Sequence, residues 1–166
     1  GKEVSHINGY LLEAPDIFIN SRGNALHNYP SIVQGNKPWD GGYLVLSAEE
    51  RNDLLTKYTE CKKYIRAFIG SYEFINGKER YCLWLHGVSP AEYRGIPEIM
   101  KRLKGVADTR RKTKTVAVQA QAETPMLFSQ IRQPDSNYLA IPEVSSERRR
   151  YVPIGFMTPD IIASNK

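Results

Sequence analysis

Residues 89–114 read SPAEYRGIPEIMKRLKGVADTRRKTK and carry a clear helical pattern. The first four, Ser89-Pro90-Ala91-Glu92, form a capping box with proline at the first helical position, which is typical of a helix start. Apolar side chains then recur at helical spacing, at Ile99, Met100, Leu103 and Val106. The pattern predicts a long basic amphipathic helix over residues 96–114 with a strongly positive polar face.

Strand patterns lie on both sides of this helix. Before it, residues 71–76 and 79–85 alternate aromatic and polar side chains around Asn76-Gly77, which predicts a β-hairpin. After it, turns separate three segments with strand character, residues 127–133, 138–144 and 151–157. The predicted fold class is therefore α+β, with an antiparallel β-sheet, a β-hairpin and the long basic helix.

The length and composition fit a small globular protein. The chain has 166 residues, 41% of them hydrophobic, which is enough for one domain or for one domain with an appended subdomain. A further capping box, Ser47-Ala48-Glu49-Glu50, predicts another helix through about Tyr58. We expect residues 1–60 to form an arm or connecting segment and residues 61–166 to form the principal domain, with a single domain over 1–166 as the alternative.

Positive charge gathers in two segments that are far apart in the sequence. The formal net charge is +5, and residues 1–60 lean acidic. The first basic segment holds Lys101, Arg102, Lys104, Arg110, Arg111, Lys112 and Lys114, and the second holds Arg148, Arg149 and Arg150. Two such segments on one surface would favour a polyanionic partner.

The second basic segment lies within residues 145–156, SSERRRYVPIGF, just ahead of an expected strand. Arginine can donate two hydrogen bonds to guanine, glutamate can accept one from the amino group of cytosine, and serine can bind phosphate or a base edge. The alternative is an ordinary solvated turn rich in arginine. The chemistry of the segment suits DNA recognition.

Catalytic and metal sites are disfavoured. Glu60-Cys61-Lys62 matches the short core of a metal-dependent nuclease, with Asp53 and Asp40 upstream, but Asp53, Glu60 and Lys62 lie in a helix-patterned segment of solvated charges. The histidines are scattered and the two cysteines lack Cys-x-x-Cys spacing. We therefore predict no catalytic residue, no metal and no disulfide.

The cellular setting follows from what the sequence lacks. No apolar run approaches the roughly 20 residues of a membrane span, and the first residues have no signal-peptide core. We expect a cytoplasmic protein with no membrane partner. Two other functions stay open: an RNA- or single-strand-binding module that stacks bases on Tyr72, Phe74, Tyr81 and Trp84, and a metal-dependent nuclease fragment.

Six blocks of the sequence together carry a resemblance to a known family. The blocks are residues 10–16 (YLLEAPD), 35–42 (GNKPWDGG), 64–70 (YIRAFIG), 74–85 (FINGKERYCLWL), 131–134 (IRQP) and 145–156. They resemble the MmeI-like class of DNA methyltransferases. In that family one polypeptide carries an N6-adenine methyltransferase domain, often a fused endonuclease, and a target recognition domain. This chain resembles the recognition domain alone, because Phe-x-Gly-x-Gly and Asn-Pro-Pro-Tyr, the methyltransferase motifs, do not occur in it.

The resemblance implies a non-catalytic fragment that binds double-stranded DNA, next to the methyltransferase domain of its parent chain. S-adenosylmethionine would be the cofactor of the parent, and the fragment itself would need none. The implied base-reading residues are Glu147, Arg149, Tyr151, Lys114 and Thr115. The residues expected to contact the DNA backbone are Arg148, Arg150, Arg110, Arg111, Lys112, Ser145 and Ser146.

Overall fold

The computed structural model describes residues 3–18, 20–23, 27–28 and 30–165. The chain forms two compact units, Gly1–Ile32 and Val33–Lys166. In the first unit the described residues contain neither helix nor strand, and the Asn8 side chain accepts hydrogen bonds from the backbone of Tyr10 and Leu12. The predicted division of the chain at residue 60 stays a prediction.

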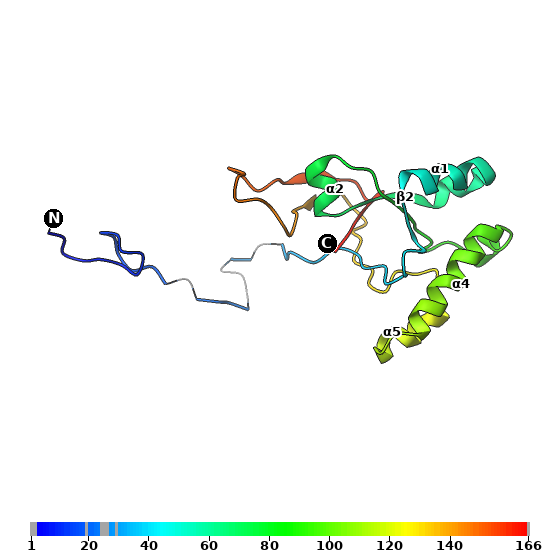
Figure 1. Cartoon of the computed structure of the whole chain (residues 1–166), viewed down its shortest axis with the longest axis horizontal. Coiled ribbons are helices and arrows are strands. Elements are labelled where there is room, and N and C mark those ends of the chain that lie inside the picture. Colours follow the sequence, from blue (N-terminus) through cyan, green and yellow to red (C-terminus); the bar gives the residue numbers. More distant parts are fainter. Residues whose placement is uncertain (1–2, 19, 24–26, 29, 166) are drawn as a thin grey trace. The chain divides into compact units, whose positions relative to one another are not determined.

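The second unit is built on a four-stranded sheet (Figure 1). Its strands are β1 (Val45–Leu46), β3 (Tyr81–Leu83), β2 (Ile65–Ile69) and β6 (Ile161–Ala163), in that spatial order. Strand β3 is antiparallel to both of its neighbours, whereas β2 and β6 run parallel. A separate antiparallel pair joins β4 (Tyr138–Ala140) to β5 (Gly155–Met157). The predicted α+β class with a mainly antiparallel sheet is confirmed.

Short helices surround the sheet. They are α1 (Ala48–Lys57), α2 (Ser71–Asn76), α3 (Pro90–Tyr93), α4 (Pro97–Arg111) and α5 (Val116–Ala120), with 3-10 helices η1 (Thr59–Tyr64) and η2 (Gln121–Glu123). The predicted capping box of α1 is present: Glu50 N–H donates to Ser47 Oγ at 3.1 Å, and Ser47 N–H donates to Glu50 Oε2 at 2.9 Å. Among the helices built from described residues, none is long and apolar enough to cross a membrane.

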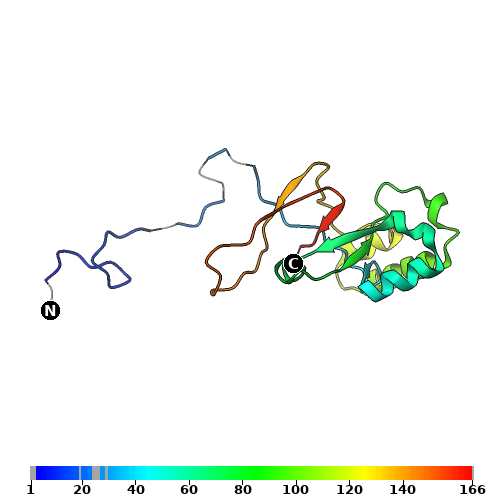
Figure 2. The same ribbon diagram turned by 90° about the horizontal axis from the view of Figure 1, so that it is seen from above.

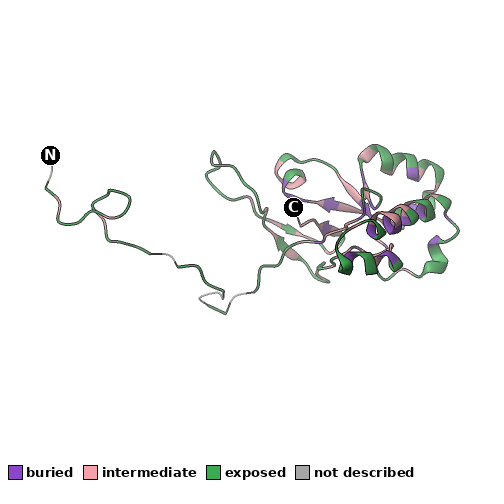
Figure 3. Ribbon diagram, turned by 60° about the horizontal axis from the view of Figure 1, so that its bottom comes forward, coloured by how far each residue is buried: buried purple, intermediate pink, exposed green. Residues whose placement is uncertain are grey.

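The hydrophobic core lies between the sheet and α4, and Figure 3 shows it as the buried part of the ribbon. Phe68 of β2 packs edge-on against Phe128 with ring centroids 5.6 Å apart, and Phe128 also contacts Trp84 at 5.1 Å. Leu103 and Val106 project from α4 into this core. The two cysteines are buried and free.

The β-hairpin predicted around Asn76-Gly77 is wrong. Residues 71–76 form helix α2, and Gly77 ends it in the left-handed conformation with φ of 59°. The carboxylate of Glu73 reaches back to the N–H of Gly70 at 2.9 Å and also binds Arg80 at 2.9 Å, so local hydrogen bonds hold the helical turn. A glycine with positive φ serves a hairpin turn and a helix C-terminus equally well, and here it ends a helix.

The long basic helix predicted over residues 96–114 is not confirmed. Helix α4 ends at Arg111, and three of the predicted residues lie beyond it. The positive charge of its polar face is also partly neutralised, because Arg102 forms ion pairs with two carboxylates. Its Nη2 lies 3.1 Å from Glu50 Oε1, and its Nε lies 3.4 Å from Glu98 Oε1.

The strands predicted after α4 are shorter than the sequence pattern indicated. Residues 127–133 form only an isolated bridge, between Lys37 and Gln130, and the other two segments pair only over residues 138–140 and 155–157. Their remaining residues, 141–144 and 151–154, join the turn at 145–150 in one long connection between β4 and β5. Strand β6, which pairs with β2, was not predicted.

Candidate nucleic-acid interface

The first group of predicted site residues lies in the connection between β4 and β5, named here the β4–β5 loop (residues 141–154). Residues 143–152 are all exposed. A turn at its tip is held by the N–H of Arg149 donating to Ser146 O at 2.9 Å, and the N–H of Arg148 donates to Ser146 Oγ at 3.3 Å. The Arg150 guanidinium lies 5.4 Å from the centre of the Tyr151 ring.

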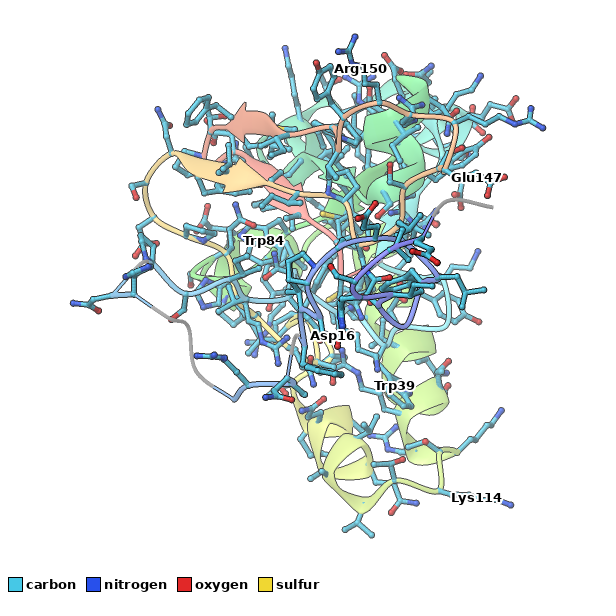
Figure 4. All side chains as sticks on the ribbon, turned by 90° about the vertical axis from the view of Figure 1, so that its left-hand side faces the viewer. Asp16, Trp39, Trp84, Lys114, Glu147 and Arg150 are labelled. Carbon is cyan, nitrogen blue, oxygen red and sulfur yellow. The ribbon has the colours of Figure 1, made fainter. Side chains whose placement is uncertain are left out.

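The charges of this tip are not neutralised by one another. Within the described part of the chain, neither Glu147 nor the arginines at 148–150 form an ion pair. Figure 4 shows Glu147 and Arg150 projecting from the loop into open space. Four charged side chains are therefore available to a ligand, whereas the Ser146 hydroxyl already accepts the N–H of Arg148.

The base of the β4–β5 loop is fixed to the sheet. Tyr138 Oη donates to the carbonyl of Ile161 at 2.6 Å, and Gln133 Nε2 donates to the same carbonyl at 2.8 Å. Burial raises the pKa of the Tyr138 hydroxyl, so it stays a donor at neutral pH. On the other strand Gly155 lies against Phe74, where a Cβ would come within 2.8 Å of the ring. The tip is thus free, and the base that carries it is anchored.

The second group of predicted site residues lies between α4 and α5, named here the α4–α5 corner (residues 112–115). Lys112, Lys114 and Thr115 are exposed. The N–H of Thr115 donates to Thr113 Oγ1 at 3.4 Å, and the Gln119 side chain donates to the carbonyl of Thr113 at 2.7 Å. The corner therefore presents one hydroxyl and two ammonium groups on a short, hydrogen-bonded turn.

Arg110, predicted to contact the DNA backbone, does not lie on the surface. Its side chain is 0% exposed, and its five N–H groups donate to five backbone carbonyls within the protein. This prediction is wrong, because helical spacing marks Arg110 as part of a polar face but does not reveal the carbonyls that surround it. The neighbouring Arg111 is exposed and lies within 3.4 Å of Asp108 and Glu123.

The structure does not bring the two groups into one cluster. Figures 1 and 2 show the β4–β5 loop at one end of the second unit and α4 with α5 toward the other. In Figure 4, Glu147 lies near the top and Lys114 near the bottom, both toward the same edge of the view. The groups could contact different steps of one long ligand, but they cannot share a small one.

The features of the alternative functions are dispersed. Trp84 packs on Phe128 within the core, and Tyr81 lies in the sheet with the Arg51 guanidinium 4.6 Å from its ring centre, so both rings already have partners within the protein, whereas Tyr72 is exposed. The Asp40 carboxylate accepts the N–H groups of Leu44 and Val45 at 2.6 and 3.1 Å. Among the residues that the structure describes, no three acidic, histidine or cysteine side chains lie close enough to hold a metal ion.

Several residues that shape this surface were missed by the sequence prediction. Gln133 and Tyr138 anchor the β4–β5 loop, and Gln119 holds the corner. Asn36 is buried and donates to Gln133 Oε1 at 2.9 Å, which orients that anchor. Its only signal in the sequence is a polar residue placed in a block that resembles the family.

Comparison with known proteins gives concordant matches. Residues 13–166 match the family model described as MmeI, target recognition domain. The chain is 37% identical over 164 residues to a protein of Bacillus subtilis (strain 168) named DNA methyltransferase A. The match covers 99% of this chain and 19% of that protein.

A solved structure is also similar. It is described as the Type IIL restriction-modification enzyme MmeI in complex with DNA, with a TM-score of 0.86 and 41% sequence identity. The match covers 98% of this chain and 22% of that one. The chain thus spans about a fifth of the length of each relative.

Proposed function

The chain belongs to the MmeI target recognition domain family, and we propose that it recognises a specific sequence in double-stranded DNA on behalf of a DNA methyltransferase. The observation that carries the proposal is the exposed, charged tip of the β4–β5 loop on an anchored base. Such a tip can enter the major groove while its base keeps it in position.

The β4–β5 loop supplies groups that distinguish base pairs. Arg149 can donate two hydrogen bonds to guanine, and Glu147 can accept one from cytosine. Tyr151 follows on the same exposed loop. Arg148, Arg150 and the two serines at 145–146 would bind phosphate, because long cationic side chains and hydroxyls donate hydrogen bonds to phosphate oxygens.

The α4–α5 corner supplies a second contact. Lys114 and Thr115 would reach base edges, while Lys112 and Arg111 would bind phosphate. Arg110 is left out of this set because its guanidinium is buried. Since the corner and the loop lie apart, each would read a different base pair of the same site.

The parent protein would transfer a methyl group to the N6 atom of adenine, with S-adenosylmethionine as the methyl donor. The residues of this chain do not fit that cofactor: their glycine-rich segment, residues 35–42, leads into β1, and its Asp40 carboxylate is taken by backbone N–H groups. The domain's part is to hold the duplex beside the adenine while the catalytic domain extrudes that base. The same proposal includes an endonuclease domain fused to the methyltransferase in the parent protein.

Binding by the methyltransferase that carries this domain tests the proposal. Arg149→Ala should weaken binding to the cognate duplex by about 1 to 3 kcal/mol and relax preference at one base pair. Lys112→Ala should weaken binding to all duplexes alike and flatten the dependence of log K on log salt by about 0.9. Competition assays with duplex and single strands at several salt concentrations measure both.

The competing function has a different signature in the same assay. If single strands competed as well as the cognate duplex, and Arg149→Ala left sequence preference unchanged, the chain would be a general single-strand binder. Equal losses for both variants on every duplex would leave only nonspecific phosphate binding, which also contradicts the proposal.

A further inference from the structure

Arg110 is a charged residue in a buried environment. It lies in the last turn of α4 and is 0% exposed. Its Nε donates to Trp39 O at 3.1 Å, and its Nη2 donates to Pro38 O at 2.9 Å and to Leu127 O at 2.7 Å. Its Nη1 donates to Gln121 O and Thr124 O, both at 3.0 Å. Every N–H of the guanidinium therefore has a backbone partner.

The Arg110 guanidinium stays positively charged although it is buried. Loss of water lowers the pKa of the Arg110 guanidinium, and the nearby Asp40 carboxylate opposes that change. Arginine nevertheless stays protonated in proteins, so five carbonyl dipoles surround a buried positive charge. Only a planar group with five diverging donors fits such a set, and a lysine ammonium has three.

The positions of the acceptors give this arrangement a consequence. Gln121 and Thr124 follow α5 in the chain, whereas Arg110 precedes the α4–α5 corner. The segment between Arg110 and Gln121, which contains the corner and α5, therefore forms a loop whose two ends are joined by the guanidinium. The same group ties those ends to the segment at Pro38 and Trp39.

We infer that Arg110 is a positioning residue, which holds the α4–α5 corner so that Lys114 and Thr115 reach their base pair. The inference rests on the proposed function and extends it to a buried side chain whose N–H groups are all bonded within the protein. A corner released from these bonds could still carry its charges, but it would no longer present them in one place. Loss of Arg110 should therefore reduce discrimination at one base pair rather than remove DNA binding.

The test uses the full methyltransferase and maps the sequences that it methylates. Lys114→Ala and Thr115→Val first identify the base pair read by the corner. Arg110→Lys should then lower discrimination at that base pair about tenfold and leave the base pairs assigned to Glu147 and Arg149 unchanged. The matched control is Arg102→Lys, which alters a second arginine of α4, whose guanidinium donates to Tyr43 O and Glu50, and it should leave the motif unchanged.

Each other outcome is decisive. If the corner variants alter one base pair but Arg110→Lys alters none, or weakens all alike, the positioning role is wrong while the proposed function stands. If the corner variants alter no base pair, the proposed function of the corner fails, and the inference falls with it.

A second variant covers the case in which Arg110→Lys does not fold, as judged by circular dichroism. Gln119→Ala removes the exposed hydrogen bond to the Thr113 carbonyl and loosens the same corner from outside the core. It should relax the same base pair. An unchanged motif in this folded variant would overturn the inference.

Discussion

Gly77 shows how one residue can determine the element that precedes it. Its φ of 59° lies in the left-handed region, and no atom stands within 4 Å of the place where a Cβ would be. A substitution there is opposed by backbone strain alone. Gly77→Ala should lower the free energy of unfolding by about 1 to 2 kcal/mol, measured by urea denaturation.

Gly95 is the matched control for that prediction. It also has open space at its Cβ position, but its φ is not positive. Gly95→Ala should change the free energy of unfolding by no more than about 0.5 kcal/mol. Equal losses for the two variants would mean that the cost at Gly77 does not come from its backbone conformation.

Gly77 and Arg110 show which structural features local sequence can and cannot predict for a single residue. The Asn76-Gly77 pair predicted a hairpin and the structure has a helix C-terminus there, because local sequence does not say whether a helix or a strand precedes a glycine of positive φ. The role of Arg110 could not be predicted, because its acceptors come from residues 38–39 and 121–127, which only the folded chain brings together.

At the scale of the element, helix α1 depends on its capping box. The pKa of Glu50 is lowered, chiefly by its hydrogen bond from the Ser47 backbone, with partial burial opposing and Arg102 adding to the effect. A carboxyl group whose pKa is lower in the folded state stabilises the fold above its unfolded pKa of about 4.5, and that contribution is lost as the pH falls further.

Glu50→Gln should therefore destabilise the protein at pH 7 by a few tenths of a kcal/mol, a small value because the side chain is half exposed and water screens it. The difference from the wild type should shrink as the pH falls from 5 to 3, since the wild-type carboxylate becomes increasingly protonated as the pH falls below its unfolded pKa of about 4.5. Urea denaturation at both ends of that range measures it. A difference that grew at low pH would contradict the lowered pKa.

The helices, strands and loops differed in how well they could be predicted from their own sequences. Helix α1 was predicted because its capping box is local. Strand β6 was missed because it is three residues long and pairs with β2 across more than ninety positions of sequence. The β4–β5 loop was found as a turn rich in charge, but its full length was hidden by β-branched residues that do not pair.

At the scale of the whole molecule, the family was identified from blocks spread along the chain, and the comparisons confirm it. The sequence suggested that the two basic segments would act on one partner. It could not show that they lie apart on the second unit (Figures 1 and 2), nor that Arg110 is buried. Separate contact groups suit a duplex, whose base pairs extend over a distance that no small ligand matches.

Methylation mapping of the full-length methyltransferase that carries this domain compares three proteins: the wild type, a loop variant carrying Glu147→Lys with Arg149→Asp, and a corner variant carrying Lys114→Ala with Thr115→Val. If the loop and the corner read separate base pairs, the loop variant changes the recognised base at one position, the corner variant relaxes a different position, and the methylated adenine stays the same. A uniform loss of methylation at all sites, or an unchanged motif in both variants, would show that the two groups do not read separate base pairs.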